Sequence, residues 1–228
     1  MICGKNEGYV HLALQSVLCF ADEIVIVGDP DDDTQKLINS VGDKRIKQIY
    51  RKWDGNYGSA RTLAVNNIST EWIFSIDADE CVTDNAFLLK DIAETAGEVN
   101  NFHVEYIHFI NHMGLIDDTQ TVHGGIRRFY KRFDNVHYAP EVHEIATSDK
   151  FGDALLIQEV KLYHLGYVPH LIDVQKKYEM NKKRSTIHSK QYLEDWHSQH
   201  LYGTYKVRPT PKEVLDEMPF PIKEMFKK

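Results

Sequence analysis

Three carboxylates that follow a short apolar run are the clearest candidates for chemistry in this chain. The run extends from Trp72 to Ile76, and Asp77, Asp79 and Glu80 come directly after it. Such a run is typical of a buried strand, and open α/β sheets bind ligands at the carboxyl ends of their strands. In an extended chain Asp77 and Asp79 point to the same side and repel each other unless a cation lies between them. The pattern indicates either a site for Mg²⁺ or Mn²⁺ or a solvated acidic turn.

Two further residues are candidates for contact with a nucleotide. The β-branched run 24–27 predicts a buried strand, and Asp29 lies at its end, where a base or a ribose can be held. Arg61 falls in the first turn of a helix predicted over 59–68, which is unfavourable for a cation unless an anion such as phosphate lies in front of it. Taken alone, this position favours a surface arginine over a phosphate ligand.

The second half of the chain adds basic and proton-carrying residues. A strand predicted over 126–132 contains Arg127 and Arg128, which could neutralise a leaving diphosphate. The segment 141–144, Glu-Val-His-Glu, holds three groups able to carry a proton. His164 lies at the end of a strand predicted over 155–162 and is a second candidate metal ligand, although a histidine at such a position is more often a hydrogen-bonded structural residue.

The elements that must position these residues alternate between strand and helix along the chain. The hydrophobic pattern predicts strands at 1–3, 24–27, 46–50, 72–76, 102–107, 126–132 and 155–162, and helices at 10–21, 34–41, 59–68 and 87–93. Asn6, Asp33 or a neighbouring acid, and Asp84 are the predicted helix caps, and residues 111–125 are predicted to form a long loop. The alternation predicts an α/β fold with a mostly parallel central sheet flanked by helices and right-handed crossovers. After Pro169 the pattern becomes helical.

Composition and charge restrict the class of protein. The hydrophobic fraction of 42% and the charged fraction of 27% are those of a globular protein. No membrane-spanning run or signal peptide is visible, and three cysteines without a metal-ligand spacing indicate reduced thiols, so we expect a cytoplasmic protein. Residues 176–228 carry a charge of +5 and the rest −12, which argues against nucleic-acid binding over a broad face. The basic segment is consistent with a solvated helical face, with contact to a second subunit, or with peripheral contact at the inner face of a membrane.

Several short motifs occur in an order that resembles a known family. They are Asn6-Glu7, the acidic turn at 29–33, Ala60-Arg61-Thr62, Asp77-Ala78-Asp79-Glu80, Arg127-Arg128, Val142-His143-Glu144 and His164-Leu165-Gly166-Tyr167. In this order they resemble the family 2 glycosyltransferases of GT-A fold, in particular the bacterial-type group with DADE and VHE motifs. The resemblance covers roughly residues 1–185.

The resemblance implies an inverting transfer from a nucleotide-sugar donor, with a UDP-sugar favoured, to a glycan, lipid-linked or protein acceptor with the help of Mn²⁺ or Mg²⁺. It implies donor contacts from Cys3, Lys5, Glu7, Asp29, Arg61, Asp77, Arg127 and Arg128. It also implies metal contacts from Asp77, Asp79 and His164, and Glu144 as the catalytic base with Glu141 as the second candidate. Thr62 and the turn Gly28-Asp29-Pro30-Asp31 depart from the family pattern, which leaves the base of the donor open.

The predicted organisation is a GT-A domain at 1–168 and a smaller helical extension at 169–228. Within the domain, the nucleotide-sugar half covers about residues 1–100 and the acceptor half about residues 101–168. Two alternatives remain open. A sugar nucleotidyltransferase also uses acids and a metal, but it commonly carries a basic, glycine-rich loop for which the segment 4–8 is too short and too acidic. A non-catalytic nucleotide-sugar or glycan-binding module is the other alternative.

Overall fold

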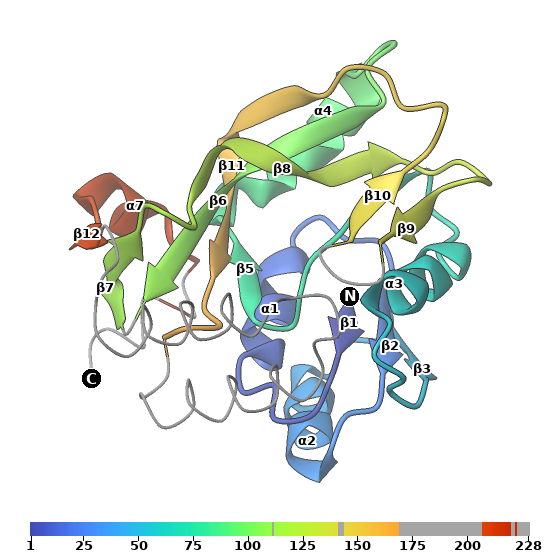
Figure 1. Cartoon of the computed structure of the whole chain (residues 1–228), viewed down its shortest axis with the longest axis horizontal. Helices are drawn as coiled ribbons and strands as arrows, with labels where there is room; N and C mark the ends of the chain where they lie inside the picture. Colours follow the sequence, from blue (N-terminus) through green and yellow to red (C-terminus); the bar gives the residue numbers. More distant parts are fainter. Residues whose placement is uncertain (111, 141–143, 169–206, 220–221, 223–228) are drawn as a thin grey trace.

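The chain folds into two β-sheets that meet at the acidic stretch. A computed structural model describes residues 1–110, 112–140, 144–168, 207–219 and 222 (Figure 1). Within these residues there are a three-stranded sheet, a seven-stranded sheet and a two-stranded hairpin. A bridge between Ile2 and Asp77 lies between the first two sheets. The carboxylates that follow the apolar run therefore lie where the two sheets come together.

The first sheet is formed by residues 2–50. Its parallel strands are β1 (Ile2–Cys3), β2 (Ile24–Gly28) and β3 (Ile46–Tyr50), connected by helices α1 (Val10–Val17) and α2 (Asp32–Val41). Alternate side chains of β2 enter different cores, since Ile24 and Ile26 pack with α1 whereas Val25 and Val27 pack with α3 (Tyr57–Asn66). Burial on both faces explains why β2 is a continuous β-branched run.

Gly28 fixes the close approach of the first two strands. A Cβ atom at this position would lie 1.8 Å from the carbonyl oxygen of Cys3, which no side chain tolerates. Because Asp29 follows Gly28 directly, its backbone is held at the carboxyl end of the parallel sheet.

The second sheet is centred on the long strand β6 (Asn101–Ile110). This strand pairs antiparallel with β7 (His112–Asp117) and β8 (Val122–Lys131), and parallel with β11 (Leu155–His164). The shorter strands β4 (Trp72–Phe74), β5 (Glu80–Val82) and β12 (Val207–Pro209) pair with β8, β11 and β7.

Two small units complete the described fold. The 3₁₀ helix η1 (Asp84–Phe87) and helix α4 (Leu88–Thr95) pack their buried residues Ala86 and Leu89 into the core that lines β6. The hairpin of β9 (His137–Ala139) and β10 (Ile145–Thr147) pairs antiparallel, and its β9 strand lies against α3 (Figure 1). This contact brings the segment before β10 towards the junction of the two sheets.

One apolar core crosses the junction between the sheets. Val10 and Ile26 from the first sheet and its helix belong to the same buried cluster as Phe102, Val104 and Phe129 from the second. A second cluster buries Val214 and Met218, from helix α7 (Lys212–Glu217) and its end, against β6 and β11. The described part of the predicted C-terminal extension therefore packs on the body of the protein.

The predicted α/β class is confirmed, and the parallel arrangement holds for β1, β2 and β3 and for the pair β6–β11. The share of parallel pairing is smaller than predicted, because β8 and β7 flank β6 through short connections that allow only antiparallel pairing. The loop predicted over 111–125 was wrong for most of its length, since β7 and the start of β8 occupy it.

Two of the three predicted helix caps were wrong. Asn6 has a left-handed backbone with φ of 62°, and α1 begins after Tyr9 without a side-chain cap. Asp31, one of the acids beside Asp33, caps α2 as predicted and accepts the Thr34 N–H at 2.9 Å. No side-chain cap precedes η1, where Asp84 was the predicted cap. Most of the helical extension predicted after Pro169 lies outside the described residues, and no helix within the described ranges has the length and apolar character to cross a membrane.

Glu23 gives the fold a pH-dependent contribution to stability. Burial alone would raise its pKa, but hydrogen bonds from Lys47, Ser69 and Thr70 lower the pKa from 4.5 to about 2. The ionised form therefore stabilises the fold above pH 4.5, and this contribution is lost as the pH falls towards 2. We expect Glu23→Gln to lower the free energy of unfolding at pH 7 by about 1.5 kcal/mol, the scale of a charge-assisted hydrogen bond.

Urea unfolding between pH 3 and pH 7 tests this expectation, because the wild type should lose more stability than Glu23→Gln over that range. Asp22→Asn is the matched control, since Asp22 contacts Lys90 at 2.8 Å on the exposed surface. Parallel pH profiles for the wild type and Glu23→Gln would contradict the assigned role.

Candidate active site

The acidic stretch forms a turn rather than a continuation of β4. The Glu80 N–H donates to the Asp77 carbonyl at 3.2 Å, and the Asp77 N–H donates to the Glu80 carboxylate at 2.8 Å. The expectation that Asp77 and Asp79 project to one side of an extended chain was therefore wrong. The turn sends Asp77 towards two arginines and Asp79 towards a histidine.

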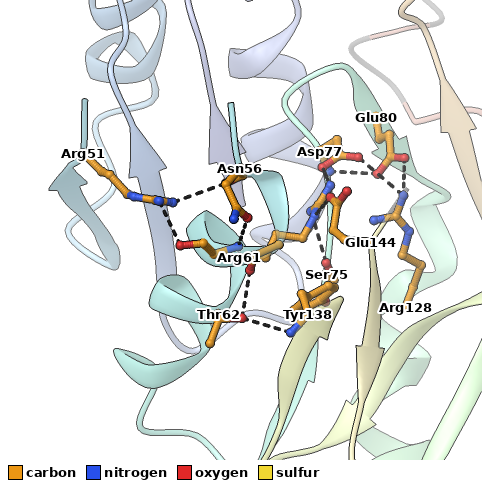
Figure 2. Close-up of polar contacts among 12 residues, drawn as sticks. Arg51, Asn56, Arg61, Thr62, Ser75, Asp77, Glu80, Arg128, Tyr138 and Glu144 are labelled. Atoms are coloured by element: carbon orange, nitrogen blue, oxygen red, sulfur yellow. Dashed lines mark hydrogen bonds and ion pairs between the residues drawn. The ribbon is translucent and has the colours of Figure 1, made fainter. Parts of the chain in front are cut away.

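Arg61 joins two acids that are far apart in the sequence. Its guanidinium contacts Asp77 and Glu144, and lies 3.5 Å from the Ser75 hydroxyl (Figure 2). The residue is only 8% exposed, so the interpretation of Arg61 as a surface arginine was wrong. Burial alone would lower the pKa of Arg61, but the charges of Asp77 and Glu144 raise it well above its usual value. Arg61 therefore stays charged and links the acidic turn to the segment of Glu144.

Helix α3 places Arg61 at this position. The side chain of Asn56 accepts the Ser59 N–H at 2.7 Å and starts the helix. A Cβ atom on Gly58 would lie 2.7 Å from the carbonyl oxygens of Tyr138 and Pro140, so this glycine lets the β9 hairpin lie directly on α3. The same contact carries Glu144 to the guanidinium of Arg61.

Arg128 forms a second buried pair beside the first. Its guanidinium lies 2.5 Å from Glu80 and 3.5 Å from Asp77 (Figure 2). Glu80 is only 1% exposed, and burial raises its pKa to about 8. Arg127 projects to the other face of β8, where it donates to Asn101 at 3.0 Å and to the Ala146 carbonyl at 2.9 Å. The structure brings Arg128 to the predicted site and does not bring Arg127 there.

Asp79 and His164 form the part of the site that suits a metal ion. β11 pairs with β5 so that His164 lies opposite Glu80, and the Leu165 N–H donates to the Asp79 carbonyl at 2.8 Å. As a result, His164 Nε2 lies 3.4 Å from the Asp79 carboxylate. Asp77, the third predicted ligand, is held by the two guanidiniums instead.

This donor set fits a cation that is shared with a substrate. No three His, Cys, Asp or Glu side chains within the described residues are arranged to enclose a metal ion. Divalent cations at phosphate sites commonly take one or two protein carboxylates and complete their coordination with phosphate oxygens and water. Asp79 with His164 would provide the protein share of such a site, with the Asp79 carboxylate as the type of ligand that Mg²⁺ and Mn²⁺ prefer.

The residues predicted to contact the base and ribose lie along the edge of the first sheet. Cys3 is buried at the end of β1, and burial raises the pKa of its thiol to about 12, so it remains neutral. Glu7 donates its backbone N–H to the Thr34 hydroxyl at 3.1 Å, while Lys5 is exposed and Asp29 is half-buried. Cys3 ends β1, and the other three residues lie in the loops that follow β1 and β2.

Sequence reasoning placed the main acids correctly near one another but missed several of their partners. It predicted no role for Glu80, although the Glu80 side chain contacts the guanidinium of Arg128 and accepts the backbone N–H of Asp77. It also ended the strand at Ile107 and so missed His108, which lies beside His164. The alternation of Tyr106 and His108 was the available signal for the latter. Glu141 and the Val142-His143 part of the second motif lie outside the described residues.

Comparisons with known proteins agree with this architecture. Residues 1–100 match the family model for glycosyl transferase family 2. The chain is 25% identical over 159 residues to the lipopolysaccharide core biosynthesis glycosyltransferase LpsC of Rhizobium meliloti (strain 1021), covering 68% of this chain and 58% of LpsC. It is 26% identical over 183 residues to the SPbeta prophage-derived glycosyltransferase SunS of Bacillus subtilis (strain 168), covering 75% of this chain and 40% of SunS. The chain thus spans about half the length of the curated relatives it matches.

Solved structures of S. aureus TarS are also similar to this chain. The structure of TarS 1–349 aligns over 88% of this chain and 69% of its own, with 12% identity and a TM-score of 0.45. The complex of TarS 1–349 with UDP aligns over 99% of this chain and 77% of its own, with 12% identity and a TM-score of 0.40.

The fold and the site define an α/β protein with acids at the junction of a parallel and a mixed sheet. The family model assigns residues 1–100 to glycosyl transferase family 2, the family that the motifs resemble. This domain and the named glycosyltransferase relatives support the prediction that the chain is a glycosyltransferase.

Proposed function

We propose that this protein transfers a sugar from a nucleotide-sugar donor to an acceptor hydroxyl, with inversion at the anomeric carbon and with the help of a divalent cation. The observation that carries the proposal is the buried link from Asp77 through Arg61 to Glu144. It joins the family 2 domain at residues 1–100 to an acid supplied by the second half of the chain. An inverting transfer needs such an arrangement, because the donor and the base act on opposite sides of one carbon.

Glu144 is the proposed catalytic base, which takes the proton of the acceptor hydroxyl as that hydroxyl attacks. Arg61 donates to Oε1 of Glu144, so the carboxylate can offer Oε2 to the acceptor. The same arginine contacts Asp77 and fixes the base relative to the donor side. General base catalysis of this kind typically contributes about 10²–10⁴-fold to the rate.

Asp79 and His164 are the residues that would hold Mn²⁺ or Mg²⁺ on the donor side. When bound, the cation would act as a Lewis acid towards the leaving diphosphate. Arg128 orients Asp77 through the contact at 3.5 Å. Cys3, Lys5, Glu7 and Asp29 are the proposed contacts for the base and the ribose.

The donor and the acceptor are proposed from relatives and from the motif resemblance. LpsC is named for lipopolysaccharide core biosynthesis, which supports assembly of a glycan or lipopolysaccharide as the setting. A UDP-sugar is the donor that the resemblance favours. We propose residues 1–168 as the transferase domain, residues 169–228 as its extension, and cytoplasmic action, with the basic extension available for peripheral membrane contact.

Release of free nucleotide from a panel of UDP-, GDP- and TDP-sugars tests the proposal. We expect slow hydrolysis of one donor with Mn²⁺ or Mg²⁺, no hydrolysis in EDTA, and a loss of at least tenfold in Asp79→Asn, because the variant removes a charged ligand. Formation of pyrophosphate and a nucleotide sugar would identify a nucleotidyltransferase instead. Calorimetric binding of a nucleotide in the presence of acceptor without any turnover would identify a binding module, and a lack of binding and turnover would refute the proposal.

A further inference from the structure

Two histidines on neighbouring strands form a direct contact beside the proposed metal ligand. β6 and β11 are parallel, and His108 lies opposite His164 in their register. The two Nδ1 atoms are 3.1 Å apart. On its other side, His164 Nε2 faces the carboxylate of Asp79 at 3.4 Å. His164 is therefore held from both ring nitrogens, by His108 on one side and by the acidic turn on the other.

The surrounding aromatic rings fix this arrangement. The centroid of the His164 ring lies 5.5 Å from that of Tyr106 and 5.5 Å from that of Tyr167. The His108 ring lies 4.7 Å from His164 and 4.8 Å from Tyr167, and His108 is only 4% exposed. The backbone N–H of His108 also donates to the Thr121 hydroxyl at 3.2 Å. Little rotation of either imidazole is compatible with this packing.

The contact between the two Nδ1 atoms constrains where the protons can lie. A hydrogen bond between them needs a proton on one nitrogen and a lone pair on the other. A metal ion at His164 Nε2 requires the lone pair on that nitrogen, so the proton of His164 must lie on Nδ1. His108 Nδ1 must then act as the acceptor. Metal-binding histidines commonly donate their other N–H to such a partner, and loss of the partner typically costs about 10–100-fold in metal affinity.

We propose that His108 is a positioning residue that holds His164 in the tautomer able to bind the divalent cation of the donor complex. This inference rests on the proposed function, because it assigns His164 to the metal. It adds a residue that acts on the cation only through His164.

A pair of variants separates the acceptor atom from the ring. His108→Phe keeps a buried ring beside His164 but removes the acceptor, whereas His108→Asn retains an oxygen near the position of Nδ1. We expect His108→Phe to weaken Mn²⁺ binding in the presence of UDP by about 10–100-fold, and His108→Asn to recover most of that loss. Electron paramagnetic resonance titration of the full chain gives the affinities, and thermal unfolding verifies that each variant folds.

A wild-type measurement keeps the test independent of folding. With ¹⁵N-labelled histidine, Mg²⁺ and UDP, we expect His164 to carry its proton on Nδ1 with a hydrogen bond to His108. Equal losses of Mn²⁺ affinity in the two variants, no loss in either, or a proton on His164 Nε2 in the loaded protein would each overturn the proposal. Normal Mn²⁺ binding without hydrolysis of any donor would overturn the proposed function and leave the role of His108 standing. A wild type that binds no Mn²⁺ would overturn both the assignment of His164 to the metal and the role of His108.

Discussion

Glu144→Gln is expected to lower kcat by about 10²–10⁴-fold while the affinity for the donor nucleotide stays within about twofold of the wild type. The amide has the size of the carboxylate and can still accept the hydrogen bond from Arg61 through Oε1. It cannot take a proton from an acceptor hydroxyl at neutral pH. The loss should therefore fall on the chemical step, as measured by initial rates with saturating donor together with calorimetric nucleotide binding.

Glu141→Gln is the control for this experiment, because it changes the other acid of the same motif. If Glu144 is the base, Glu141→Gln should keep most of the wild-type kcat. A large loss of kcat in Glu141→Gln with a small one in Glu144→Gln would move the base to Glu141. A loss of donor affinity without a change in kcat in Glu144→Gln would remove this residue from the chemistry.

Arg61→Met is expected to affect both stability and nucleotide binding. The methionine keeps much of the side-chain volume but leaves Asp77 and Glu144 without their shared cation. Removing one partner of a buried ion pair typically costs about 3–5 kcal/mol, and we expect a loss of this size in the free energy of unfolding. Because Asp77 and Glu144 also lose the side chain that positions them at the proposed donor site, nucleotide binding should weaken by about 10–100-fold.

Two comparisons separate these effects. Lys36→Met removes an exposed pair with Asp33, whose carboxylate is 2.8 Å away, and should leave the free energy of unfolding almost unchanged. Neutralising both acids in the background of Arg61→Met, with Asp77→Asn and Glu144→Gln, should restore most of the stability and none of the activity. If Arg61→Met were as stable as Lys36→Met, the buried link would not hold the site together.

Elements with a strong local pattern could be predicted from the sequence. The run Ile24 to Val27 has β-branched residues throughout and forms β2, and the alternating residues from Phe102 form β6. Asp29 lies directly after β2 as predicted, because the end of that strand determines its position. The strand pattern also predicts that only one of Arg127 and Arg128 can face the site, because adjacent side chains in a strand point to opposite faces.

What could not be predicted depends on partners distant in the sequence. β7 has no regular alternation and is held by pairing with β6 and with β12, about 90 residues further along. Arg61 is buried because its partner Glu144 comes from the β9–β10 hairpin, 83 residues away. The direction of Asp77 was missed because the chain turns there, and the turn is stabilised by Glu80. None of these contacts produces a periodic hydrophobic pattern in the neighbouring sequence.

The double arginine pairing around Asp77 has a kinetic consequence. Both guanidiniums share the carboxylate of Asp77, and Arg61 also faces the carboxylate of Glu144. A diphosphate arriving without a counterion would therefore meet side chains whose positive charge is already neutralised. We therefore expect the protein to bind the metal–nucleotide complex rather than the free nucleotide. Free nucleotide should compete poorly with that complex for the site, and the metal–nucleotide complex should bind before the acceptor.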